Sequence, residues 1–238
     1  MKLLSELKIK LFADSADKAQ ILRWKANPLV KGITTNPTLM RSAGVTNYEA
    51  FARDLLNAVG SLPVAFEVIA DDFSEMERQA RKIAGWAENV YATIPITNTR
   101  GETAMGLASR LARSGVKVNV TGVLTLDQVR YAATALGGGA PSMISVFAGR
   151  IGDTGRDPIP IMTSAVKLVS TYTNVELLWA DPRELLNIFQ ANDVGCQIIT
   201  ATESVLSKLG NLGKDLLDYS LETVQTFNAD AARSGYEL

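Results

Sequence analysis

The chain of 238 residues contains no histidine and a single cysteine. Without histidine, the sequence excludes Ser-His-Asp and Cys-His catalysis as well as histidine-ligated metal sites. The single thiol, Cys196, excludes an intrachain disulfide, and its place at the start of an apolar run favours a buried structural role. Acid–base chemistry would therefore have to use carboxylates, hydroxyls, lysine, tyrosine or water.

An excess of charge of one sign and long apolar runs are lacking as well. The 24 basic and 25 acidic residues give a net charge of −1 and form no basic stripe, which argues against a nucleic-acid partner. The apolar runs are too short to span a membrane, and Glu6 interrupts the N-terminal segment where a signal peptide would need an apolar core. We therefore expect a cytoplasmic protein without a membrane partner.

An apolar run followed by an amphipathic, helix-like run occurs eight times along the chain. The apolar runs are residues 8–14, 30–36, 64–71, 90–97, 117–123, 143–149, 176–181 and 197–202. Short apolar runs that alternate with helical patterns are typical of parallel strands in βαβ units. The sequence therefore predicts an α/β protein, a single (β/α)8 TIM barrel over residues 1–238, with an additional C-terminal helix over residues 216–232.

Helix starts are marked by capping residues and prolines. Asn36-Pro37 and Asp72 each precede a helical pattern, and Asp181-Pro182 predicts a further helix from residue 183. The C-terminal helix lies beyond the eight units. It must therefore pack outside the barrel or onto a neighbouring subunit.

In such a barrel the chemistry lies at the C-terminal ends of the strands. The polar residues expected there are Asp14, Thr34, Thr35, Asn36, Glu67, Thr93, Asn119, Thr121, Ser145, Arg150, Thr200 and Thr202. Because side chains alternate along a strand, Asn119 and Thr121 share a face, as do Ser145 and Phe147. These residues predict one polar ring at the barrel mouth.

Each of these residues also has a purely structural interpretation. Glu67 lies among apolar neighbours, where burying a carboxylate without a partner is costly. It is either a functional carboxylate or the partner of a barrel arginine in a salt bridge. Asp14 could instead cap the next helix, and Asn36 could be a turn residue. Thr34 and Thr35 could be ordinary β-branched strand residues.

Several segments together resemble the transaldolase family. They are FADSAD (12–17), GITTNPTL (32–39), VYATIPIT (90–97), VNVT (118–121), ISVFAGRIGD (144–153) and NIFQANDVGCQIITAT (187–202). The resemblance implies a (β/α)8 barrel that transfers a dihydroxyacetone unit between sugar phosphates through a Schiff base on a strand-four lysine. Glu67 and Phe147 resemble transaldolases more than the fructose-6-phosphate aldolase branch, which tends to carry Gln and Tyr there.

The resemblance also implies roles for individual residues. Asp14 would be the acid/base for carbon–carbon cleavage, and Glu67 and Thr121 would hold a proton-shuttling water. The implied substrate-binding residues are Asn36, Thr35, Asn119, Ser145, Phe147 and Arg150, with Arg150 facing a phosphate. No cofactor and no metal are expected; a Mg²⁺ site at Glu67, Asp71 and Asp72 is a minor alternative. The implied assembly is a homo-oligomer, a pentamer or decamer.

One position departs from the family motif V-Y-x-K-I-P-x-T. Thr93 stands where the Schiff-base lysine is expected, and a hydroxyl cannot form an imine. No other lysine is expected at a strand's C-terminal end. Either Thr93 is a substitution, natural or introduced, in an otherwise intact catalytic site, or the chain is a non-catalytic sugar-phosphate-binding paralogue. A fructose-6-phosphate aldolase-like lyase is a further alternative.

A second departure lies at the end of the seventh strand. The family usually has a Ser-x-Arg/Lys pattern there, whereas this chain has no basic residue until Arg183. We therefore expect the phosphate grip to be rebuilt or weakened.

Overall fold

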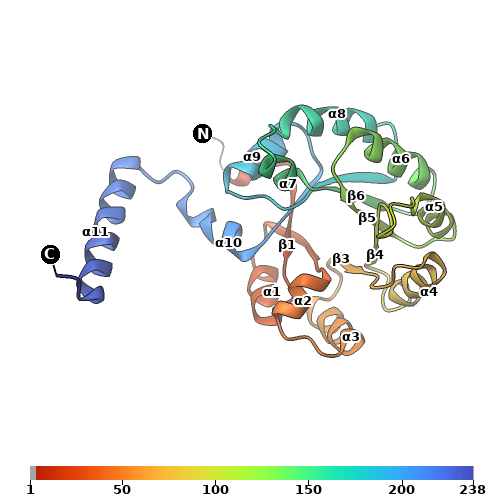
Figure 1. Ribbon diagram of the computed structural model, residues 1–238, viewed down its shortest axis with the longest axis horizontal. Coiled ribbons are helices and arrows are strands. Elements are labelled where there is room, and N and C mark those ends of the chain that lie inside the picture. Colours follow the sequence, from red (N-terminus) through yellow and green to blue (C-terminus); the bar gives the residue numbers. More distant parts are fainter. Residues whose placement is uncertain (1–3, 238) are drawn as a thin grey trace.

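The computed structural model describes residues 4–237 and contains a closed barrel of eight parallel strands in the order β1 to β8. Figure 1 shows the strands in a ring with helices around the outside. The strands are Lys10–Asp14 (β1), Val30–Thr34 (β2), Val64–Glu67 (β3), Val90–Pro95 (β4), Val118–Val123 (β5), Ser142–Val146 (β6), Val175–Trp179 (β7) and Ile198–Ala201 (β8). The predicted (β/α)8 barrel is confirmed, with all eight strands within or close to the predicted runs.

Helices follow each strand. They are Lys18–Lys25 (α1), Pro37–Ser42 (α2), Tyr48–Val59 (α3), Phe73–Ala84 (α4), Met105–Arg113 (α5), Leu126–Leu136 (α6), Ala148–Asp153 (α7), Ile159–Val169 (α8), Leu186–Asp193 (α9), Glu203–Leu206 (α10) and Leu216–Ser234 (α11). Asn36 and Asp72 cap α2 and α4 by accepting hydrogen bonds from backbone N–H groups, as predicted.

The helix after β7 begins later than predicted. It starts at Leu186 rather than at residue 183, so Arg183 lies in the loop that joins β7 to α9. The loop also holds Asp181 with a φ of 60°, in the left-handed region. A helix N-cap typically has an extended backbone, and Asp181 does not, so the Asp-Pro pair does not act as a helix start here.

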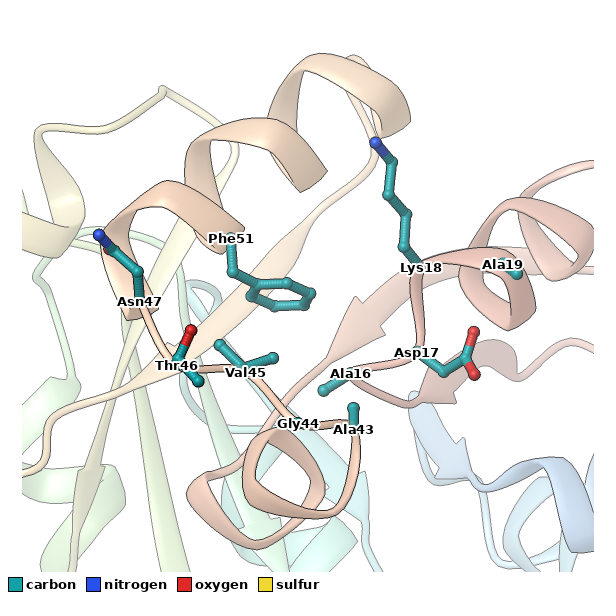
Figure 2. A pocket seen from close by; sticks show the side chains of 10 residues that line it. All are labelled: Ala16, Asp17, Lys18, Ala19, Ala43, Gly44, Val45, Thr46, Asn47 and Phe51. Atoms are coloured by element: carbon teal, nitrogen blue, oxygen red, sulfur yellow. The ribbon is translucent and has the colours of Figure 1, made fainter.

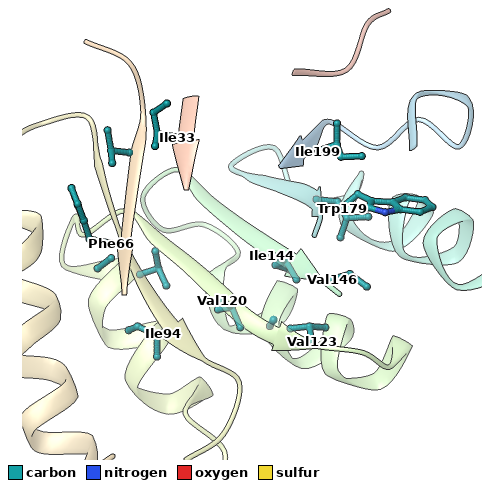
Figure 3. Packing of buried hydrophobic residues seen from close by; sticks show 14 of the residues in the cluster. Ile33, Phe66, Ile94, Val120, Val123, Ile144, Val146, Trp179 and Ile199 are labelled. Atoms are coloured by element: carbon teal, nitrogen blue, oxygen red, sulfur yellow. The ribbon is translucent and has the colours of Figure 1, made fainter. Parts of the chain in front are cut away.

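The ring of strands separates two apolar cores, one between the strands and the helices and one inside the barrel. Outward-facing strand residues such as Ile33, Phe66 and Ile94 pack against the helices, as Figure 3 shows. A smaller cluster fills the barrel interior with Phe12, Ala65, Met143, Leu178, Ala180 and Ile198. Gly32 makes room for it, because a Cβ there would lie 2.4 Å from the Phe12 ring. Apolar side chains therefore fill much of the interior, and the polar residues lie toward the C-terminal strand ends.

Helix α11 lies apart from the barrel. None of its residues is buried, and Figure 1 shows it at the end of an extended segment that leads away from α10. The predicted additional helix is thus present, and it makes no packing contact that buries its apolar side chains. None of the helices in residues 4–237 is both long enough and apolar enough to cross a membrane.

Candidate active site

A first hydrogen-bonded cluster joins three neighbouring strands at the barrel mouth. Thr34 Oγ1 donates to Asp14 Oδ1 over 2.7 Å and lies 2.5 Å from Thr200 Oγ1. Because Thr34 donates its single hydroxyl proton to Asp14, the hydroxyl of Thr200 must donate to Thr34 Oγ1. The helix cap that could have explained Asp14 is instead Asp17, which caps α1. The Asp14 side chain is therefore held by a hydrogen bond from the neighbouring strand and does not cap a helix.

A second cluster continues around the mouth from β4 to β6. Asn119 Nδ2 donates to Thr93 Oγ1 over 3.2 Å, and Ser145 Oγ donates to Asn119 Oδ1 over 2.7 Å. All three side chains are buried, and Thr93 is only 3% exposed. Paired buried polar groups of this kind keep a fixed geometry, because a broken bond leaves an unsatisfied partner.

Glu67 lies between the two clusters at the end of β3. It is opposite Thr93 in the parallel ladder between β3 and β4. Its carboxylate forms no ion pair within residues 4–237, so the salt bridge to a barrel arginine, one of the two interpretations, is wrong. Tyr48 instead fixes this strand end by donating its hydroxyl to the Glu67 carbonyl oxygen over 2.6 Å.

Both mouth carboxyls titrate close to neutrality. Burial raises the pKa of Glu67 from 4.5 to about 7, and the nearby Asp14 charge adds to the rise. Burial likewise raises the pKa of Asp14 from 3.8 to about 6, against a lowering by the Thr34 hydrogen bond, with a further rise from Asp181. Carboxyls with pKa values near 7 are suited to both accepting and donating protons.

The remaining predicted residues are placed less uniformly. Thr121 shares the inward face of β5 with Asn119, whereas Thr35 donates its hydroxyl to the backbone oxygen of Ala65. The side-chain oxygen of Asn36 accepts from Leu39 N, so this atom caps α2 and Asn36 is a helix N-cap, not a turn residue. Phe147 follows β6 and packs against the interior apolar cluster.

Charged residues form the rim above β6 and β7. The guanidinium of Arg150 lies over the Phe147 ring at 5.1 Å, and its Nε is 3.4 Å from Asp181 Oδ2. Arg183 Nη1 donates to Asp181 Oδ1 over 2.8 Å, and Arg183 also pairs with Asp153. The loop after β7 therefore carries an arginine, Arg183, but no serine of the expected Ser-x-Arg/Lys pattern; Asp181 lies two residues before that arginine.

Sequence reasoning did not select Asp181, Arg183 or Tyr48. Asp181 lies two residues after the end of β7, and that position was the available signal. Thr34 and Thr200 belong to the polar strand ends but were not selected as site residues. Their hydrogen bonds to and beside Asp14 depend on three strands meeting in the closed barrel, which one strand's sequence does not reveal.

The lysines of the strands lie at the other end of the barrel. Lys10 begins β1 and pairs with Glu176 near the start of β7, and Lys117 precedes β5 and donates to the Glu88 carbonyl oxygen. At the mouth, Asp71 and Asp72 hydrogen-bond to Thr99 and to the α4 backbone rather than to Glu67. Residues 4–237 contain no cluster of metal-ligating side chains.

Two cavities lie beside the mouth. One of about 390 Å³ is lined by Glu67, Pro37, Pro95 and the loops that follow β3 and β4. The other, of about 510 Å³, lies between the start of α1 and the loop from α2 to α3, and Figure 2 shows Phe51, Val45 and Asp17 around it. Only the first reaches a predicted catalytic carboxyl.

The chain matches the family model described as transaldolase/fructose-6-phosphate aldolase over residues 11–238. It belongs to the transaldolase/fructose-6-phosphate aldolase family. A probable transaldolase of Methanococcus maripaludis is 34% identical over 204 residues, covering 85% of this chain and 90% of the relative. A probable transaldolase 2 of Listeria monocytogenes is 33% identical over 202 residues, covering 84% and 88%. Family membership, predicted from the motifs, is thus confirmed.

Solved structures support the fold. The 3-hexulose-6-phosphate synthase of Salmonella typhimurium superposes with a TM-score of 0.59 at 14% identity, covering 84% of this chain and 91% of that one. A putative phosphonomutase of Burkholderia cenocepacia gives 0.55 at 13% identity, covering 97% and 96%. At these identities the likeness concerns the barrel alone.

Proposed function

We propose that the barrel mouth is a transaldolase-type chamber for an open-chain ketose, and that Thr93 occupies the position of the Schiff-base lysine. The observation that carries the proposal is the continuous polar lining around Thr93, with Glu67 opposite it and Asn119 hydrogen-bonded to it. Family membership supports the same chemistry. The sugar phosphates implied by the resemblance supply the ketose carbonyl that such a chamber requires.

In this proposal an amine at residue 93 attacks the ketose carbonyl carbon, and water leaves as the imine forms. Glu67 and Thr121 hold the water that carries protons during that step. Asp14 takes the hydroxyl proton as the carbon–carbon bond breaks and returns it to the acceptor. The Thr93 side chain has no amine nitrogen and so cannot form an imine; in this proposal the chain as it stands binds the ketose without turnover.

A non-catalytic sugar-binding role is the second candidate, favoured by one observation. The Thr93 hydroxyl accepts a hydrogen bond from Asn119, so residue 93 is part of the buried polar cluster even without an amine. A binding protein would retain such a lining without the amine. An aldolase-like lyase differs from a transferase only in the acceptor, which would be water-derived protons in place of a second sugar.

The test is ligand-detected NMR on the natural chain with dihydroxyacetone and fructose as probes. We expect saturable binding that weakens at least about tenfold in Asn119→Ala, because that change removes hydrogen bonds at the chamber wall. The matched control is Asn211→Ala, at the end of the 3-10 helix that follows α10 and outside the strands that line the chamber. No binding by the folded natural chain, or equal binding by both variants, would refute the chamber.

We also propose that α11 docks on a second copy of the chain. Leu217, Leu221, Val224 and Phe227 recur at spacings of three or four and form one apolar face. Leu217 is 82% exposed and Phe227 is 68% exposed. A solvated helix of this length is marginal alone, so burial of this face against a neighbouring subunit would stabilise it. The expected pentamer or decamer would provide such neighbours.

A further inference from the structure

The rim above β6 and β7 holds two cations and two anions that pair with one another. Asp181 accepts from Arg183 through one carboxylate oxygen and lies beside Arg150 through the other. Asp153 takes the other edge of the Arg183 guanidinium, with its Oδ1 3.1 Å from Arg183 Nε. The formal charge of these four residues is therefore zero. Arg150 and Arg183 could together bind a dianion, but both already form ion pairs with the rim carboxylates.

Asp181 is held in this place by the fold. Within residues 4–237 it is the only residue other than glycine with a positive φ, at 60°. A Cβ on Gly149 would lie 1.6 Å from the Asp181 carbonyl oxygen, so α7 and the loop after β7 can approach this closely only because residue 149 is glycine. Arg150 follows Gly149 directly, so the same contact sets the Asp181 carboxylate against the Arg150 side chain.

This arrangement opposes a phosphate at the rim. Arginine binds phosphate best through paired N–H donors, and one nitrogen of each guanidinium group, Arg150 Nε and Arg183 Nη1, is already directed at an Asp181 oxygen. An incoming dianion would also stand close to the Asp181 carboxylate, and like charges in a partly enclosed site repel. The hydroxyls of a neutral sugar carry no such penalty, because they can donate to the carboxylate and accept from the guanidinium groups.

We infer that Asp181 sets the substrate class of the chamber, so that it takes an unphosphorylated polyhydroxy ketose in preference to its phosphate ester. The inference rests on the proposed function. It replaces the sugar phosphates that the resemblance implies by neutral ketoses as the preferred ligands. Asp181 acts at the rim, on the part of the ligand remote from the carbonyl.

The test compares fructose with fructose 6-phosphate in the natural chain and in Asp181→Asn. Asparagine suits this site because it tolerates a positive φ and keeps the side-chain shape. Affinities come from ligand-detected NMR, and inorganic phosphate followed by ³¹P NMR gives a second probe that needs no carbonyl chemistry. Asp153→Asn is the matched control, since it removes one rim carboxylate that pairs with Arg183 but not with Arg150.

The natural chain should bind fructose at least as tightly as fructose 6-phosphate. Asp181→Asn should tighten fructose 6-phosphate and inorganic phosphate about tenfold, or about 1.4 kcal/mol, while fructose changes little. Asp153→Asn should have a smaller effect. Preference of the natural chain for the phosphate ester, or no gain for phosphate in Asp181→Asn, would overturn the inference alone. Failure of both sugars to bind the natural chain would overturn the proposed function and this inference with it.

Discussion

The deep part of the barrel mouth and its rim are both polar but are built differently. In the deep part, Thr93, Asn119 and Ser145 are buried and hydrogen-bonded in series, and two carboxyls have raised pKa values. At the rim, the side chain of Arg150 is 63% exposed and the charges pair in solvent. Burial therefore fixes the geometry of the deep part and tunes its proton affinities, whereas the rim can change its charge at little cost to the fold.

The largest effect that separates the two parts is on catalysis. In a Thr93→Lys background, Glu67→Gln and Asp14→Asn should each lower turnover of a ketose about 100-fold to 10,000-fold, because each removes an acid–base group. Asp153→Asn at the rim should lower it less than about threefold, because an exposed pair contributes little energy. Steady-state kinetics on the three double variants measures the contrast. Equal losses in all three would remove the distinction between the two parts.

The pH dependence of stability is the next largest effect. The pKa values of Asp14 and Glu67 are raised in the fold, so the folded chain binds more protons than the unfolded chain between about pH 4 and 7. The free energy of unfolding should consequently fall as pH rises through this window, by up to about 3 kcal/mol for each carboxyl. Denaturant unfolding at pH 5 and pH 8 measures the fall.

Glu67→Gln should reduce this fall, because the amide does not titrate. The matched control is Glu75→Gln on α4, where Arg78 lowers the pKa of an exposed glutamate. That group stabilises the fold above its unfolded pKa, so its removal should leave the fall between pH 5 and pH 8 unchanged. A fall of the same size in Glu67→Gln as in the natural chain would contradict the burial argument.

A smaller effect is expected from the rim on stability. Arg150→Ala removes the ion pair with Asp181 and the contact with the Phe147 ring, and should cost no more than about 1 kcal/mol of unfolding free energy. Thermal and denaturant unfolding at pH 7 measure the loss. A loss above about 3 kcal/mol would show that the rim, too, is part of the barrel's structural framework.

Removal of α11 should have the smallest effect on the barrel itself. Deletion of residues 216–238 exposes no buried side chain of the barrel, because α11 contributes none to its core. We expect a folded barrel whose far-ultraviolet circular dichroism has lost only the helical signal of α11, together with loss of assembly in analytical ultracentrifugation. Asp218→Asn, which leaves the apolar face intact, serves as the control that should still assemble. Unchanged assembly after the deletion would refute docking through α11.

The sequence predicted most of the fold because strand and helix patterns are local. Asn36-Pro37 predicted the start of α2, and alternation along β5 and β6 placed Asn119 and Ser145 on the interior. The contact between Arg150 and Asp181 was not predictable in the same way. It depends on a left-handed backbone conformation and on the close approach at Gly149, and neither follows from a local pattern. The Thr35 hydroxyl likewise found a backbone partner on the next strand.

The most direct test of the chamber is covalent trapping at residue 93. Thr93→Lys is incubated with dihydroxyacetone and reduced with borohydride, and the adduct is located by peptide mass mapping. Dihydroxyacetone carries no phosphate, so the result is independent of Asp181. The account predicts a reduced adduct on residue 93 and none on the natural chain. A folded Thr93→Lys chain that traps nothing, or that is modified only at other lysines, would contradict it.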